Sequence, residues 1–225
     1  MDRVLRSAIL NSNVIDVIQD NKRPFDELMS KYRCAIMEIE TKFKVLNEQY
    51  SLQYDRNPIE TIKTRLKSME SISRKLAQKG KSFSAKSMEE NLDDIAGVRV
   101  ICSFQEDIYT LAKCLLDQDD IELLETKDYI KNPKPSGYRS LHLIVRVPIF
   151  LQNEKCFMKV EVQLRTIAMD FWASLEHKLR YKKGLEDSED YQEISRQLKN
   201  CAEISAMLDR LMENIRGQIE GGRAL

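Results

Sequence analysis

The chain is poor in the residues that build metal centres and covalent cross-links. Its 225 residues include two histidines, His142 and His177, and no HExxH or HxxxH spacing. A histidine-type zinc or two-metal hydrolase site therefore cannot be assembled. The five cysteines are scattered, odd in number and without a CxxC pair, which argues against a disulfide framework or a zinc site. We expect most of them to be buried small hydrophobes, and we expect a cytoplasmic protein.

The chain also lacks an excess of charge and a long apolar run. Lysine plus arginine and aspartate plus glutamate both number 36, so the formal net charge is zero and no basic excess indicates DNA or RNA as the main partner. No apolar stretch approaches the roughly 20 residues that cross a bilayer. The segment "MDRVLRSAIL" lacks the layout of a signal peptide. A Ser-His-Asp triad has no supporting GxSxG segment.

Apolar residues at steps of three and four predict helices at both ends of the chain. The first 20 or so residues indicate a weak helix, "NKRP" predicts a break, and Pro24 is suited to begin a helix that runs to about residue 50. Another amphipathic helix is expected from 58 to 80, with lysines along one face. The segment from about 190 to Glu220 keeps a strict four-three rhythm, which is typical of helices that associate with one another.

The middle of the chain changes to a period of two, which predicts strands. The expected elements are strands at 97–104, near 121–130, at 141–147 and at 157–165, with helices at 106–117 and 168–182. They make a mixed sheet of four or five strands with helices around it. Three of the strands carry an apolar face for the core and a second face with charged residues, which is the candidate functional surface.

Two carboxylates point to a metal site on that face. Asp94 stands in "LDDIAGVR" just before the first strand, and Glu161 lies in the middle of the last strand on its polar side. Mg²⁺ needs one or two fixed carboxylates, because water and phosphate complete its coordination. From the spacing alone, a solvated Glu161 and an Asp94 that caps a turn remain the alternative.

A cationic set accompanies the carboxylates. It comprises the lysines of 58–80 together with Arg65 and Arg99. A polyphosphate requires several positive groups that converge from different elements, and an arginine plane can also stack on a base. A solvated helix face is the alternative for the lysines.

The segment "PKPSGYRSLH" crowds polar groups at the start of a strand. Gly137 permits a sharp turn and the close approach of a ligand, and Tyr138 offers its ring as a platform for a nucleobase. The alternative is that Tyr138 packs on the sheet edge and that His142 is satisfied beside Glu161 or Gln163.

Four segments, "DDIAGVRVICSF", "KPSGYRSLH", "VEVQLRT" and "DFWASLEHKLRYK", resemble in this order the synthetase domain of RelA/SpoT-type alarmone enzymes. The similarity covers about residues 55 to 220, and the length resembles that of the stand-alone small alarmone synthetases. The resemblance implies an α+β fold with a mixed sheet of the nucleotidyltransferase type. It also implies transfer of a pyrophosphoryl group from ATP to the ribose 3′-hydroxyl of GDP or GTP, which gives ppGpp or pppGpp and AMP.

The resemblance implies roles for the residues that match the family's motifs. Asp94 and Glu161 would hold Mg²⁺, and Glu161 would help to deprotonate the attacking hydroxyl. The implied nucleotide contacts are Arg65 and Arg99 on the two sides of adenine, Lys67 and Lys75 at the ATP phosphates, Tyr138 stacked on guanine, His142 and Gln163 along the acceptor, and Lys134 at the acceptor's phosphates.

Some features depart from the family or stay open. Gln78 stands where relatives often have arginine, so one phosphate contact is in doubt, and Lys79 or Lys81 could substitute. The hydrolase and ribosome-sensing domains of the long enzymes are absent from the sequence, so we expect synthesis without degradation. The role of the first 20 or so residues and the preference between GDP and GTP are open.

The resemblance also implies an oligomer. We expect N-terminal helices over 1–54, a synthetase core over 55–185 and an oligomerisation helix over 186–225, because small members of the family resemble tetramers built through terminal helices. The alternative is that these helices pack on their own domain. Allosteric binding of an alarmone or RNA is open.

Two rival functions remain at this stage. One is a toxin-like member that places the pyrophosphate on the 3′ end of tRNA, and the other is a catalytically idle member that binds nucleotide or RNA. Tyr138 and the balanced charge speak against the first. Retention of both Asp94 and Glu161 speaks against the second.

Overall fold

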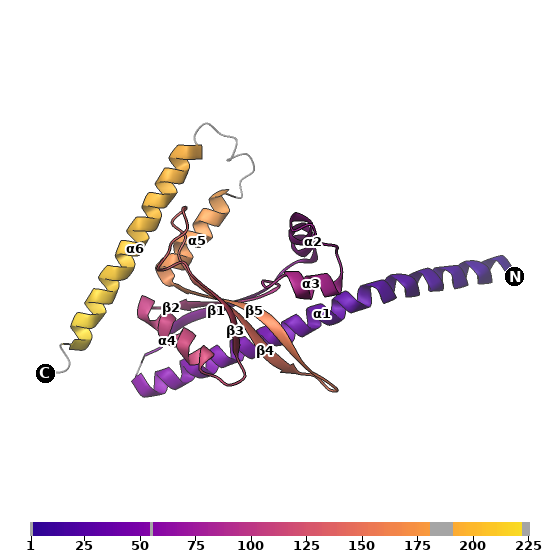
Figure 1. Cartoon of the computed structure of the whole chain (residues 1–225), viewed down its shortest axis with the longest axis horizontal. Coiled ribbons are helices and arrows are strands. Elements are labelled where there is room, and N and C mark those ends of the chain that lie inside the picture. Colours follow the sequence, from indigo (N-terminus) through magenta and orange to yellow (C-terminus); the bar gives the residue numbers. More distant parts are fainter. Residues whose placement is uncertain (1, 55, 181–190, 222–225) are drawn as a thin grey trace.

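The computed structural model describes residues 2–54, 56–180 and 191–221, in which a mixed five-stranded sheet is flanked by helices (Figure 1). The strands are β1 (Ile59–Leu66), β2 (Ala96–Cys102), β3 (Glu122–Asp128), β4 (Leu141–Phe150) and β5 (Lys155–Thr166). Their order across the sheet is β1-β2-β5-β4-β3. β2 and β5 are parallel, and the other neighbours are antiparallel. The predicted α+β class with a mixed sheet is confirmed.

The helices of the described residues are α1 (Asp2–Tyr54), α2 (Met69–Gln78), α3 (Ala85–Asn91), α4 (Gln105–Leu116), α5 (Ile167–Arg180) and α6 (Tyr191–Gly221). α1 lies along the sheet and continues beyond it toward the N-terminus, whereas α5 and α6 lie together at the opposite end of the molecule (Figure 1). Within the described residues, no helix combines the length and apolar character needed to cross a membrane. Lys182, the expected end of the helix that begins near 168, lies outside the described residues.

α1 is a single helix, whereas the sequence predicted a break at "NKRP". Pro24 lies inside α1 and does not begin a new helix, so this prediction was wrong. A proline inside a helix costs about 3 kcal/mol, which a long helix with a buried apolar face can bear. That face was predicted correctly, because its residues are buried in the core: Met29, Tyr32, Ile36, Ile39, Phe43 and Leu46.

The helix predicted from 58 to 80 was wrong in its first half. Residues Ile59–Leu66 form the edge strand β1, which pairs with β2, and only Met69–Gln78 is helical. The segment is rich in isoleucine and threonine, which suit a strand, and pairing along β2 overrides a helical spacing of the apolar residues. Ser68 then begins α2, because its hydroxyl accepts a hydrogen bond from the backbone N–H of Ser71 at 3.3 Å. The lysines of this segment therefore do not share one helix face.

The sheet has one apolar and one polar face. The register places Arg99 and His142 opposite Gln163, and Lys63 opposite Arg99, so these side chains share one face. The alternate positions face the core against α1 and α4, and they are buried: Val98, Val100, Val145, Val160, Val162 and Leu164. The strand faces predicted from the period of two are thereby confirmed.

Candidate active site

A pocket of about 350 Å³ lies on the polar face over β1, β2 and β5. The side chains and backbone that line it belong to Lys63, Thr64, Arg65, Lys67, Asp94, Gly97, Val98, Arg99, Glu161 and Gln163. Most of the residues singled out from the sequence therefore meet at one place. The two carboxylates lie on the same side of the sheet, as a shared metal ion requires.

Asp94 lies in the turn before β2, where it is held by two lysines from different elements. Its Oδ2 accepts hydrogen bonds from Lys67 Nζ, after β1, and Lys75 Nζ, on α2, both at 2.6 Å. Burial by itself raises the pKa of Asp94, but the hydrogen bonds from Lys67 and Lys75 outweigh burial and hold the pKa below its usual range. The carboxylate is therefore ionised at neutral pH.

Glu161 lies in the middle of β5 and is oriented by two polar neighbours. Its Oε1 is 3.2 Å from His142 Nδ1, and its Oε2 accepts a hydrogen bond from Gln163 Nε2 at 2.8 Å. Burial raises the pKa of Glu161, but the hydrogen bonds with His142 and Gln163 act in the opposite direction, so the pKa is lowered overall. The nearby charge of Asp94 raises the pKa of Glu161, which shows that the two carboxylates are electrostatically coupled.

The residues present fit a magnesium ion that is shared with substrate. Asp94 Oδ1 is buried and has no hydrogen-bond partner among the described residues. A buried carboxylate oxygen without a partner is costly, and a bound cation would satisfy it. Across the part of the chain that the structure describes, no group of three or more His, Cys, Asp and Glu side chains could hold a metal. Water and phosphate oxygens would have to complete the coordination, as is usual for Mg²⁺.

The two arginines expected at the donor base enter the pocket from neighbouring strands. Arg65 on β1 is exposed, and its Cα pairs with that of Gly97 on β2. Arg99 on β2 donates from Nε to Gln163 Oε1 at 3.3 Å and from Nη1 to Asp170 Oδ1 at 3.2 Å. Arg99 is thus held by two neighbours, whereas Arg65 is exposed at the pocket.

The loop that carries the expected acceptor residues is folded against α6. Gly137 has φ +90°, and a Cβ at this position would lie 2.5 Å from the Cβ of Ala202 on α6. Only glycine fits both the backbone conformation and the space. A backbone hydrogen bond from Gly137 to the Lys134 carbonyl at 2.8 Å closes a tight turn. Lys134 Nζ lies 4.7 Å from the centre of the Tyr129 ring and 5.1 Å from that of Tyr138.

Tyr138 and His142 lie together between this loop and Glu161. The Tyr138 hydroxyl is 2.8 Å from His142 Nε2, and His142 is 8% exposed. The Tyr138 ring also packs against the small cluster formed by Trp172, Ala173 and Ala202. The alternative contact foreseen from the sequence for His142, beside Glu161, is therefore present, whereas Tyr138 packs against residues of α5 and α6. These contacts are compatible with a role in binding, because they hold both rings beside the pocket.

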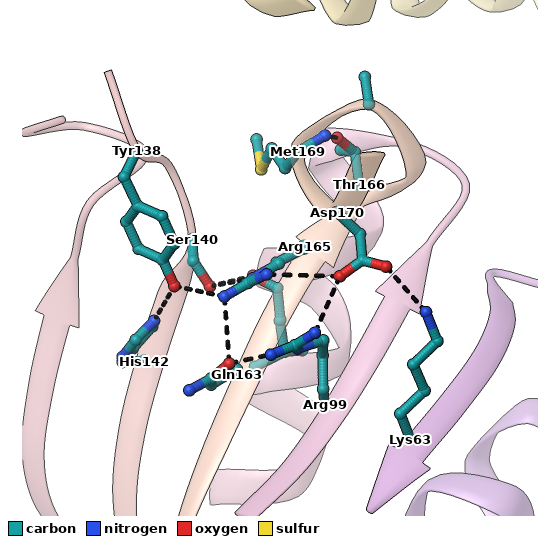
Figure 2. Close-up of polar contacts among 12 residues, drawn as sticks. Lys63, Arg99, Tyr138, Ser140, His142, Gln163, Arg165, Thr166, Met169 and Asp170 are labelled. Atoms are coloured by element: carbon teal, nitrogen blue, oxygen red, sulfur yellow. Dashed lines mark hydrogen bonds and ion pairs between the residues drawn. The ribbon is translucent and has the colours of Figure 1, made fainter. Parts of the chain in front are cut away.

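Two residues of this region, Arg165 and Asp170, were not among the predicted site residues. Asp170, in the first turn of α5, accepts hydrogen bonds from Lys63 Nζ at 2.9 Å, Arg99 Nη1 at 3.2 Å and Arg165 Nη1 at 3.3 Å (Figure 2). Burial raises the pKa of Asp170, but the hydrogen bond from Lys63 and the charges of the arginines lower it overall. The available signal was position, because Arg165 and Asp170 stand inside "VEVQLRT" and "DFWASLEHKLRYK".

Gln78 is the last residue of α2, and it is exposed. Nearby, Lys79 Nζ donates to the Asn91 carbonyl at 2.7 Å. Whether Lys79 or Lys81 replaces the arginine of relatives stays a prediction.

Comparison with known proteins gives a consistent result. The family model described as "Region found in RelA / SpoT proteins" matches residues 64–186. GTP pyrophosphokinase YwaC of Bacillus subtilis is 46% identical over 189 residues, which are 84% of this chain and 89% of the relative.

Two solved structures share the fold. The small alarmone synthetase 2 from Bacillus subtilis has a TM-score of 0.77 at 44% identity, and the match covers 86% of this chain and 98% of that one. The small alarmone synthetase 1 from Bacillus subtilis, bound to its product pppGpp, has a TM-score of 0.78 at 33% identity over 88% of this chain and 99% of that one.

Proposed function

The chain belongs to the RelA/SpoT family and is a small alarmone synthetase, a GTP pyrophosphokinase, and from this premise we propose how the pocket performs the reaction. The pyrophosphoryl group of ATP passes to the 3′-hydroxyl of GDP or GTP, so that ppGpp or pppGpp forms and AMP leaves. One observation supports this assignment most directly. Two carboxylates 67 positions apart in sequence, Asp94 and Glu161, line one pocket whose other charged groups are cationic.

The donor nucleotide lies between β1, β2 and α2 in this proposal. Arg65 and Arg99 hold adenine between their guanidinium planes, which stack well on aromatic bases. Lys67 and Lys75 now share Asp94 Oδ2, and they turn to the triphosphate when ATP arrives, because its charge exceeds that of one carboxylate. The same lysines thus hold Asp94 and neutralise the donor.

The acceptor nucleotide lies toward β4 and the loop before it. Guanine stacks on Tyr138, Lys134 approaches the 5′-phosphates, and His142 and Gln163 line the path to the ribose. Together these contacts direct the 3′-hydroxyl toward Glu161.

The chemical step is an in-line displacement at the β-phosphorus. The acceptor 3′-oxygen forms a bond to Pβ, the bond from Pβ to the oxygen that bridges to Pα breaks, and AMP departs with that oxygen. Glu161 is ionised and oriented by His142, so it can accept the proton of the attacking hydroxyl. Asp94 and Glu161 would hold Mg²⁺, which neutralises charge on the transferred group when bound. Otherwise the protein acts mainly by positioning the two nucleotides.

We also propose that the chain assembles with copies of itself through its terminal helices, as a homotetramer. α6 leaves a row of apolar side chains about half exposed along its length: Ile204, Met207, Leu208, Leu211, Met212, Ile215 and Ile219. A continuous apolar row on one helix is unusual for a surface that faces only water, and it suits helix–helix contact between copies. The cytoplasmic location stays a prediction.

A single assay tests the function. The full chain is incubated with ATP, Mg²⁺ and either GDP, GTP or tRNA, while AMP release and labelled product are followed. We expect a guanosine product, its loss in Glu161→Gln with the fold preserved, and unchanged synthesis in the matched variant Glu154→Gln, whose carboxylate pairs with Lys31 at the far end of the β4–β5 hairpin. Labelled tRNA without a guanosine product would favour the toxin-like rival, and no turnover with any acceptor would favour the idle one.

A further inference from the structure

A continuous polar chain connects the two sides of the pocket through one buried arginine. Arg165 on β5 is 4% exposed, and all of its donor groups are directed at polar atoms (Figure 2). Its Nη1 donates to Asp170 Oδ1 at 3.3 Å, its Nη2 to the Tyr138 hydroxyl, and its Nε to Ser140 Oγ at 3.4 Å. The guanidinium carbon also lies 5.0 Å from the centre of the Tyr138 ring. Arg165 therefore restrains the tyrosine both at its hydroxyl and at its ring.

The hydrogen bonds beyond Arg165 have a direction. Arginine can only donate, so the Tyr138 oxygen is an acceptor toward Arg165 and its O–H is available to His142 Nε2. When His142 accepts this hydrogen at Nε2, the ring proton is on Nδ1, and that N–H donates to Glu161 Oε1 at 3.2 Å. The chain from arginine to tyrosine to histidine thus ends on the catalytic carboxylate.

The same arginine is joined to the donor side by two shared acceptors. Asp170 accepts from Arg165 and also from Arg99 and Lys63 (Figure 2). Gln163 Oε1 accepts from Arg99 Nε at 3.3 Å and from Arg165 Nη2 at 3.2 Å. The Asp170 carboxylate thus faces three cations. Its removal leaves Arg99 and Arg165 to repel each other where the proposed adenine and guanine sites meet.

We propose that Arg165, held in place by Asp170, is a positioning residue that orients Tyr138 for the acceptor nucleotide and ties this site to Arg99 on the donor side. The proposal rests on the proposed function, because it uses the same pocket for the same two nucleotides. Neither Arg165 nor Asp170 touches a reacting atom. Their effect passes through the tyrosine and through the donor-side arginine.

The decisive variants separate the hydrogen bond from the fold. Tyr138→Phe keeps the ring and removes the hydroxyl, Arg165→Lys keeps the charge and loses the forked geometry, and Asp170→Asn removes the shared anion. Arg146→Lys is the matched control. Arg146 lies on β4, on the same polar face of the sheet as His142, but it pairs with the exposed Glu122. All are measured as the full chain, with the KM for GDP, the KM for ATP and the thermal midpoint.

The expected pattern is specific to positioning. Loss of a hydrogen bond to a charged group corresponds to about a tenfold change in affinity, so Tyr138→Phe and Arg165→Lys each raise the KM for GDP about tenfold and leave the KM for ATP within about twofold. The KM for GDP of the double variant of Tyr138→Phe and Arg165→Lys is no higher than that of the poorer single variant, because both substitutions remove the same hydrogen bond between Arg165 and Tyr138. Asp170→Asn raises both KM values, because it releases Arg165 and Arg99 together, and Arg146→Lys changes neither.

Two outcomes would overturn the proposal. One is an unchanged KM for GDP in Tyr138→Phe, a substitution that the fold tolerates even if Arg165→Lys does not. The other is a double variant whose effect is the product of the single effects. Calorimetric titration with GDP keeps the two proposals distinguishable. A wild-type chain that binds GDP without turnover refutes the proposed function, whereas equal GDP affinity in wild type and Tyr138→Phe refutes the role of Arg165.

Discussion

The two long terminal helices, α1 and α6, carry the same kind of apolar repeat, but the repeat is buried on α1 and exposed on α6. On α1 the repeat faces the sheet, and Ile39 and Phe43 are both 0% exposed. On α6 the repeat faces away from its own domain, and Met212 and Ile215 are 49% and 48% exposed. Helical spacing of apolar residues thus predicts that a face needs a partner. It does not predict whether the partner is the same chain.

α6 is attached by a different side, through small and polar residues. Ala202 packs beside Gly137, the Asp209 carboxylate accepts from the Thr166 hydroxyl at 2.9 Å, and Trp172 Nε1 donates to the Leu198 carbonyl at 2.9 Å. These contacts hold α6 against the acceptor loop and α5 while leaving the apolar repeat available. α1 therefore belongs to the folding core, and α6 joins the candidate site to a surface suited to assembly.

The largest expected effect comes from removing a buried side chain of α1. Phe43→Ala deletes a fully buried ring from the core, and it should reduce the free energy of unfolding by about 3–5 kcal/mol. Urea unfolding followed by circular dichroism measures the change. A loss below about 1 kcal/mol would show that α1 is not part of the core and would erase the contrast with α6.

The next effect concerns the contact between α6 and the acceptor loop. Gly137→Ala combines a positive φ with a Cβ that would lie 2.5 Å from Ala202, so we expect a loss of stability of about 1–3 kcal/mol and a higher KM for GDP. Gly80→Ala is the control, because Gly80 has φ +64° but no atom within 4 Å of the added Cβ. Equal behaviour of the two variants, with the KM for GDP unchanged in both, would mean that α6 does not shape the loop.

A smaller effect is a pH dependence of stability, which we expect for the attachment of α6 but not for that of α1. Burial raises the pKa of Asp209 on α6, although the hydrogen bond from Thr166 opposes this. A carboxyl whose folded pKa is raised favours the folded state fully below the unfolded pKa of about 3.9, and this advantage is lost as the pH rises through the folded pKa. Relative to Asp209→Asn, wild type should gain stability as the pH falls from 7 toward about 4.

The matched comparison for this pH dependence is the variant on α1. The stability difference between wild type and Phe43→Ala should stay constant over the same range, because that contact contains no titrating group. Urea unfolding at several pH values measures both differences. A difference for Asp209→Asn that grows with rising pH in favour of wild type would reverse the sign and contradict the prediction.

The smallest effect on folding is expected on the exposed repeat of α6. Leu208→Ser and Ile215→Ser together should change the unfolding free energy of the chain by less than about 1 kcal/mol, because both sites are about half exposed. They should lower the assembly state in sedimentation velocity. Met37→Ser, on the exposed side of α1, should leave assembly unchanged. A tetramer that persists in the double variant would rule out the α6 row as the contact between copies.

The success and failure of prediction along the chain have a common physical basis. The strands of the middle segment were found because their period of two and their buried partners agree. Residues 59–66 were mistaken for a helix because an edge strand has only one neighbour, and its apolar spacing also suits a helix. The break predicted at Pro24 was wrong for a similar reason. The local preference of proline against a helix interior is outweighed by the packing of α1 on the core.

Some residues of the candidate site could likewise be predicted from the sequence, and others could not. Asp94 and Glu161 could be chosen from the sequence, because a carboxylate before one strand and another on the polar side of a second strand are visible in the pattern. Arg165 and Asp170 lie inside two segments that resemble the family, but their residue types and spacing do not distinguish them from surface residues. Their importance follows from burial and from the partners that β5 and α5 bring within reach.

By itself, then, the sequence determined which residues belong to strands of the sheet's centre, which faces are apolar, and which acidic and basic groups are available for phosphate chemistry, since these depend on periodicity and residue type. The tertiary structure alone decided that β1 is a strand, that the repeat of α6 is left exposed, and that one buried arginine joins the tyrosine to the donor side. These depend on distances between segments far apart along the chain, and only the folded backbone sets such distances.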